Sequence, residues 1–328
     1  MIQGILDSSE CEAEIKVFTK LLQLSIVSNQ GDFIKTEAVM PYRVFSDARR
    51  MLAKYNCAEA QFLLHVLKRK SDAALQRVTA LSNVEESFLY FSQLKDLYPN
   101  EYFMAGNNLV ALLLQSKGIG VQPSRKNETE LFREPFRLAQ FLLGELPKRA
   151  PIPLYMYLKN NELIAKRFYT DVPFEDKELQ TFESQINKLD HDSQIMFHMN
   201  LGTHYAYMGQ YKEARQSWNI AEGLNGDGDD FFAYIIESNR LVCELCEGRK
   251  PEFLQLATPA LMSEPEIMQY VTLRNELIQE LISKESIKNY QSIEAAFANK
   301  FESAFAKANL VFYSKPFLFS DVQFWSDN

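Results

Sequence analysis

Apolar residues recur at the spacing of an α-helix along most of the chain. In the segment 84–98, Phe88, Phe91, Leu94 and Leu97 fall on one face, and Pro99 ends the pattern. Because residues three or four positions apart share a helix face, this spacing predicts amphipathic helices rather than strands. The same pattern predicts helices over residues 11–27, 38–55, 59–68, 72–81, 101–117, 131–143, 175–189 and 287–310, and a capping box at 263–266 opens a further helix to residue 282.

The segment 151–174 interrupts the helical period. Two short apolar runs, 154–158 and 163–169, flank the neighbouring residues Asn160 and Asn161. Short apolar runs around an Asn-containing turn are typical of a β-hairpin. A helix interrupted by the Asn pair is the alternative, and both interpretations place a boundary here.

Residues that break helices are scarce. The 328 residues include only 12 Gly and 12 Pro. Folds rich in strands need frequent turns, so this scarcity favours long helices joined by short connections. The length allows two ordinary domains or one elongated repeat array, and we favour the array.

The most regular pattern lies at residues 195–228. Gly202 and Ala214 are small where two antiparallel helices would cross, and Gly209 stands at the turn between them. Tyr205 and Trp218 are large enough to fill the space between neighbouring pairs. With Leu201, Tyr211 and Ala221, this spacing resembles the tetratricopeptide repeat, a helical pair of about 34 residues.

The resemblance implies an all-α fold, a right-handed α-solenoid of antiparallel helix pairs. One pair cannot bury its apolar face alone, so the clear repeat implies more degenerate neighbours. The predicted organisation is degenerate helical repeats at 1–150, a hairpin or insertion at 151–174, repeats at 175–262, and capping helices with an aromatic tail at 263–328.

The resemblance also implies a concave binding face, lined by the first helix of each pair. On the clear repeat this face would carry Met196, Met199, Asn200, Thr203 and Tyr207. Such side chains suit a polypeptide segment held by apolar contacts and a few hydrogen bonds. Packing of Met196 and Met199 against a neighbouring helix is an equal alternative.

Aromatic residues are concentrated near the C-terminus. Phe317, Phe319, Phe324 and Trp325 follow Pro316, and such a segment is expected to dock rather than remain solvated. It docks either on the last helices of its own chain or on a partner.

The charge balance argues against nucleic acid. There are 35 Lys and Arg against 43 Asp and Glu, a net charge of -8, whereas phosphate binding requires a basic surface. Two short basic clusters, 68–70 and 148–149, are expected to be solvated. No apolar run reaches the length of a membrane span, so we expect a cytoplasmic protein that does not enter membranes.

Residues arranged for chemistry are sparse. Cys243 and Cys246 form a CxxC sequence without the second ligand pair that a zinc site needs, and no phosphate-binding or nucleophile motif occurs. We therefore expect no metal, cofactor or catalytic residues, and interpret the chain as a protein–protein interaction adaptor or regulatory subunit. The alternative is a sensor of a peptide or small ligand that relays a conformational change.

Overall fold

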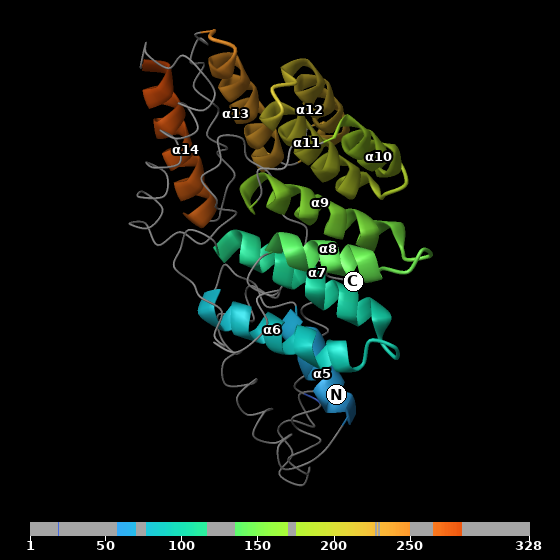
Figure 1. Ribbon diagram of the computed structural model, residues 1–328. Helices are drawn as coiled ribbons and strands as arrows, with labels where there is room; N and C mark the ends of the chain where they lie inside the picture. The colour runs from blue at the N-terminus through green and yellow to red at the C-terminus, as the bar shows by residue number, and fades with distance from the viewer. Residues whose placement is uncertain are drawn as a thin grey trace. The chain divides into compact units, whose positions relative to one another are not determined.

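The computed structural model describes residue 19 and residues 58–69, 77–116, 135–169, 175–226, 228, 230–249 and 265–283. Over these residues the chain is all-helical and contains no strand (Figure 1), which confirms the predicted all-α class for this part. The predicted helices 38–55 and 287–310 lie outside the described residues, and of the predicted helix 11–27 only residue 19, which is helical, is described. The described helices are α5 (Ala58–Arg69), α6 (Arg77–Gln93), α7 (Pro99–Ser116), α8 (Pro135–Glu145), α9 (Ile152–Tyr169), α10 (Asp176–Ile186), α11 (His191–Tyr207), α12 (Tyr211–Asn225), α13 (Asp230–Cys246) and α14 (Pro265–Ser283).

The chain divides into two compact units. Of the described residues, those up to Leu109 belong to the first unit and those from Val110 onward belong to the second. Each unit is described by itself below.

In the first unit, α5 is joined to α6 and α7 by the cations of its last turn. Lys68 forms an ion pair with Glu86, and Arg69 Nε donates to Glu101 Oε2 at 2.7 Å. Both cations are buried, contrary to the prediction that the basic cluster is solvated. A cation is tolerated in a protein interior when a carboxylate pairs with it.

Two helix boundaries of the first unit also differ from prediction. Helix α6 runs unbroken from Arg77 to Gln93 through the predicted break near residue 82. It ends four residues before Leu97, which lies in the turn before Pro99 and is 71% exposed. The helical spacing of Leu97 with Leu94 is therefore coincidental, because the backbone has left the helix there.

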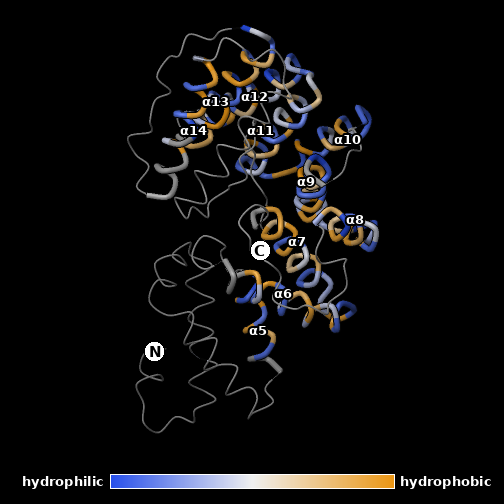
Figure 2. Tube along the Cα trace, turned by 60° about the vertical axis from the view of Figure 1, so that its left-hand side comes forward, coloured by the Kyte–Doolittle hydropathy of each residue, from blue (hydrophilic) through white to orange (hydrophobic). Residues whose placement is uncertain are grey.

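In the second unit, helices pack mainly against neighbours in chain order. Helix α9 contacts α8, α10 and α11, while α13 contacts α11, α12 and α14 (Figure 1). Each helix carries both polar and apolar positions (Figure 2), as expected for amphipathic helices. Large side chains at the centre of the core include Phe182, Phe197 and Trp218, all fully buried.

The predicted β-hairpin is wrong. Residues 152–169 form one continuous helix, α9, and Asn160 and Asn161 lie within it, fully buried. Asn160 Oδ1 accepts a hydrogen bond from Asn200 Nδ2 of α11 at 3.1 Å. Because this amide is satisfied by a neighbouring helix, it does not need the turn that asparagine favours in isolation.

Helices α11 and α12 pack as a close antiparallel pair. A Cβ on Gly202 would lie 2.8 Å from Cε2 of Trp218 and closer still to Nε1, and Trp218 Nε1 donates to the carbonyl of Met199 at 3.0 Å. Gly209 ends the turn with a φ of 74°. The predicted crossing at Gly202 and turn at Gly209 are confirmed, but Trp218 fills the space inside the pair.

Candidate functional site

Six polar side chains from four helices of the second unit form a polar seam. Each is fully buried, although protein interiors are mostly apolar. A buried polar group is tolerated when it is hydrogen-bonded, and seam residues on neighbouring helices bond to one another. The polar seam comprises Asn160 of α9, Asn200 and Thr203 of α11, Ser238 and Asn239 of α13, and Arg274 of α14.

Two separate contacts connect the helices of the polar seam. Asn200 of α11 donates to Asn160 of α9, as described above. On the next turn of α11, Thr203 Oγ1 accepts from Asn239 Nδ2 of α13 at 3.4 Å and donates to the carbonyl of Met199 at 3.2 Å. Helix α11 is therefore hydrogen-bonded to α9 through Asn200 and to α13 through Thr203, one turn further along.

Arg274 extends the polar seam to α14. Its Nε donates to Ser238 Oγ and its Nη2 donates to Asn239 Oδ1, both at 2.9 Å. The planar guanidinium matches two acceptors on adjacent residues of one helix. Tyr234 adds a second polar contact between these helices, donating to Asn275 Oδ1 at 2.9 Å.

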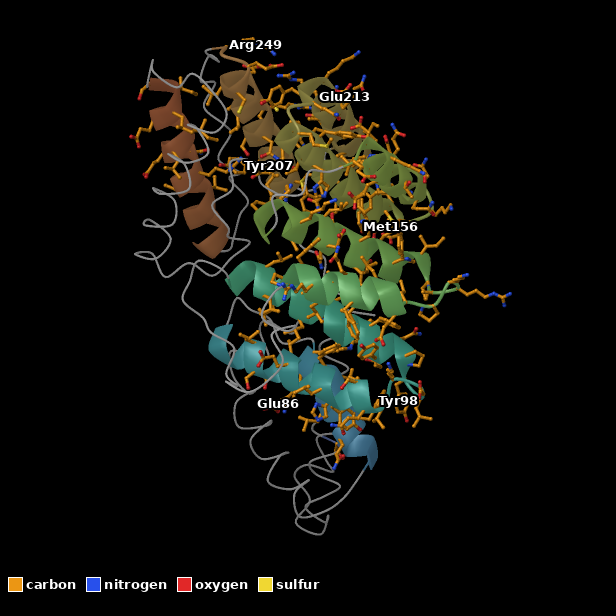
Figure 3. The ribbon with its side chains drawn as sticks, viewed as in Figure 1. Glu86, Tyr98, Met156, Tyr207, Glu213 and Arg249 are labelled. Carbon is orange, nitrogen blue, oxygen red and sulfur yellow. The ribbon has the colours of Figure 1, made fainter. Side chains whose placement is uncertain are left out.

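Tyr207 is the last residue of α11, and Arg167 lies near the end of α9. Both are partly exposed (Tyr207 is labelled in Figure 3). The Arg167 guanidinium carbon lies 4.4 Å from the centroid of the Tyr207 ring. This distance is typical of a cation–π contact. The Tyr207 ring is therefore accessible at the end of α11, packed against Arg167, whereas the seam residues are fully buried.

A cluster of ion pairs joins α9 to α10. Lys159 Nζ donates to Glu162 at 2.7 Å and to Glu178 at 2.6 Å, and Lys166 Nζ donates to Glu178 at 2.8 Å. Burial alone would lower the pKa of Lys159, but the two carboxylates outweigh it and raise that pKa. Burial likewise would raise the pKa of Glu178, and the two lysines lower it. Lys159 and Glu178 are therefore charged at neutral pH.

His204 makes the stability of the second unit sensitive to acid. Burial, together with the charges of Arg167 and Lys159, holds the pKa of this fully buried imidazole well below 6.5. The unfolded chain takes up a proton as the pH falls through 6.5 while the folded chain does not, so acid lowers the free energy of unfolding.

At about pH 5.5 this loss is on the order of 1 kcal/mol. His204→Gln should remove that part of the pH dependence in urea unfolding compared between about pH 7.5 and 5.5. His191→Gln, a change at an exposed histidine of the same helix, should keep it. An unchanged pH dependence in His204→Gln would contradict the assignment.

The predicted binding residues occupy different environments. Met199, Asn200 and Thr203 are fully buried and contact other parts of the chain, whereas Met196 and Tyr207 are partly exposed. The structure brings Asn200 and Thr203 into one polar seam. The predicted tail residues Phe317, Phe319, Phe324 and Trp325 lie outside the described residues.

Four of the six residues of the polar seam were not predicted from the sequence. Asn160 was assigned to a turn, and Ser238, Asn239 and Arg274 were not singled out. The available signal was the polar stretch 237–240 between the apolar runs 231–236 and 241–243, in which Ser238 and Asn239 stand three or four positions from the apolar Ile235 and Val242 and so share their helix face. A polar residue on a buried face needs a partner, so this pattern predicts a buried contact.

The CxxC sequence lies at the end of α13. Cys243 is fully buried and Cys246 partly exposed, and burial raises the pKa of the Cys243 thiol. The pKa of Tyr211 is raised as well, by burial and by the Cys246 thiol, which is hydrogen-bonded to the Tyr211 hydroxyl. Within the described ranges, no group of three or more His, Cys, Asp or Glu side chains could hold a metal ion.

None of the described helices is long and apolar enough to cross a membrane. Comparisons with protein-family models, with curated proteins and with solved structures found no match.

Proposed function

We propose that this protein is an interaction adaptor or regulatory subunit that binds a polypeptide segment on a surface formed by α9, α11 and α13. The observation that carries the proposal is the polar seam, in which these helices and α14 align amide, hydroxyl and guanidinium groups. A buried polar network contributes to register more than to stability, because apolar packing would be at least as stable. The polar seam thus sets the register of the helices whose exposed edges contact the partner.

The contact surface on this proposal is the exposed edge beside the seam. Tyr207 and Arg167 are partly exposed at its end, and Met196 is partly exposed eleven residues earlier on α11. Tyr, Arg and Met are enriched at protein interfaces. A large aromatic ring held by a neighbouring guanidinium loses little freedom on binding, which favours affinity. Asn200 and Thr203 act in positioning these helices.

Two further features support a solenoid of tetratricopeptide type. The close crossing of Gly202 against Trp218 and the turn at Gly209 match the small positions of that repeat. In addition, α9 contacts α11, and α11 contacts α13. Such arrays bind partners along the surface that successive helices build.

The proposal includes a cytoplasmic location, no cofactor, no catalysis, and a protein or peptide rather than nucleic acid as partner. The internal pairing of Lys68 with Glu86 and of Arg69 with Glu101 supports the last point. Cations engaged inside the first unit do not contribute to a phosphate-binding surface.

The test is affinity purification from the native host with mass spectrometry, comparing wild type with Tyr207→Ala. We expect a specific partner whose recovery falls by at least about tenfold, since truncating a central aromatic contact commonly has such an effect. Ile220→Ala is the matched control, because Ile220 is 44% exposed and lies on α12, a helix that the proposed surface does not include. A partner recovered equally with Tyr207→Ala would exclude this surface.

A second function, sensing of a peptide or small ligand, is favoured by the complete burial of the polar seam. A ligand that reached Asn239 or Thr203 would have to separate helices, so its binding would be coupled to movement of α13 and α14. The test is hydrogen exchange before and after addition of the low-molecular-weight fraction of a host extract. Faster exchange in α13 and α14 supports a sensor, and unchanged exchange throughout counts against it.

A further inference from the structure

The α8–α9 tip is an exposed surface that the proposed function does not use. It consists of the end of α8, the connection 146–151 and the start of α9, all in the second unit. Helix α8 buries Pro135, Leu138, Ala139 and Leu142 and leaves its other side exposed. The connection projects from the end of the antiparallel pair (Figure 1).

Apolar and cationic groups occur together at the α8–α9 tip. Phe141 is 41% exposed and Ile152 is 37% exposed, two of the few large apolar side chains in the described ranges that are this accessible. Pro147, Pro151 and Pro153 are also exposed. Between them stand the exposed cations Lys148 and Arg149, beside one exposed carboxylate, Glu145.

The tip is also sterically open and locally rigid. A Cβ on Gly144 would meet no atom within 4 Å. The Ala150 amide donates to the Pro147 carbonyl at 2.8 Å, and the Tyr155 amide donates to the Pro151 carbonyl at 3.2 Å. Three prolines with these bonds restrict the backbone, so the surface loses little conformational entropy when it binds.

We propose that the α8–α9 tip is a second docking surface, and that its partner is an acidic, amphipathic polypeptide segment. The apolar side chains of such a segment would cover Phe141 and Ile152, and its carboxylates would pair with Lys148 and Arg149. The tip carries two exposed cations and one exposed carboxylate, so its own net positive charge is complementary to an acidic segment.

The small number of cations at the tip argues against an anionic lipid surface as the partner. Lipid recognition by basic segments uses clusters of about four to eight Lys and Arg residues. The tip has only two cations, beside one carboxylate, which is fewer than such a cluster. A peptide can instead place its few carboxylates opposite both cations and its apolar residues opposite Phe141.

The test uses fluorescence anisotropy with a labelled peptide that alternates pairs of glutamate and leucine. We expect binding that weakens with salt and falls by at least about tenfold in the double variant Lys148→Glu/Arg149→Glu and in Phe141→Ser. The matched controls are Lys177→Glu/Lys212→Glu and Ile220→Ser, which change exposed residues on α10 and α12. They should bind as wild type does.

Several results would overturn the proposal. These are no binding of the peptide, equal weakening in the control variants, or equally tight binding of a peptide with lysine in place of glutamate. Binding to phosphatidylserine vesicles that is lost in Lys148→Glu/Arg149→Glu would assign the tip to lipid instead. Tyr207→Ala should leave peptide binding unchanged, so failure of this surface and failure of the proposed function are distinguishable.

Discussion

Gly202→Ala is expected to lower the free energy of unfolding by about 3 kcal/mol. The new Cβ would overlap the indole of Trp218, and such overpacking costs about 1–3 kcal/mol. If the indole moves away, its hydrogen bond to the Met199 carbonyl is lost as well. Leaving a buried donor without an acceptor costs about 1–3 kcal/mol. The better helix propensity of alanine recovers only about 1 kcal/mol.

Gly223→Ala is the matched control for this change. Gly223 also lies inside a helix, α12, but a Cβ there would meet nothing within 4 Å. We expect this variant to be more stable than wild type by up to about 1 kcal/mol, through helix propensity alone. Urea unfolding of both variants measures the difference, and equal stability of the two would show that the crossing at Gly202 is not tight.

Asn200→Asp is expected to lower the free energy of unfolding by about 3–5 kcal/mol at pH 7. The substitution keeps the shape of the side chain but removes the Nδ2 donor to Asn160 Oδ1. It places a carboxylate at a fully buried position, facing the oxygen that formerly accepted that bond. An unpaired buried charge has no water to solvate it, so the folded state is penalised.

The pH dependence of the stability of Asn200→Asp shows whether the buried carboxylate causes the loss. Burial raises the pKa of the introduced carboxyl in the folded state, so the folded chain binds more protons than the unfolded chain. Stability therefore increases as the pH falls from 7 toward about 5, opposite to the effect of His204. The comparison should be made as the difference between variant and wild type at each pH.

Asn219→Asp provides the matched control on an exposed site. Asn219 Oδ1 accepts from Arg240 Nη2 at 2.6 Å on the surface of α12, so a carboxylate there keeps its partner. We expect a change within about 0.5 kcal/mol of wild type. If Asn200→Asp were equally well tolerated, the contact between Asn200 and Asn160 would not hold α9 against α11.

Local patterns predicted the helices well where the sequence carried its own boundaries. A helix opening at the capping box 263–266 and continuing to residue 282 was predicted, and α14 spans Pro265–Ser283, since Pro265 favours the first turn of a helix. The turn at Gly209 was predicted because a positive φ favours glycine. These signals act within a few residues of the position they determine.

The candidate site was predicted less well, because its residues are brought together by contacts across the chain. Asn200 and Thr203 were singled out for a binding face, but their partners Asn160 and Asn239 lie 40 and 36 residues away. Whether an asparagine side chain turns the backbone or bonds to another helix depends on what packs against it.

The sequence by itself determined the helical class of the described residues, most helix positions, and the small residues where α11 and α12 cross, because spacing and steric size are local properties. Only the tertiary structure decided that Asn160 lies inside a helix, that Lys68 and Arg69 are buried in ion pairs, and that Asn200 is covered. The physical reason is that the free energy of a polar side chain depends on its partner and on its access to water. Both are set by residues distant in the sequence.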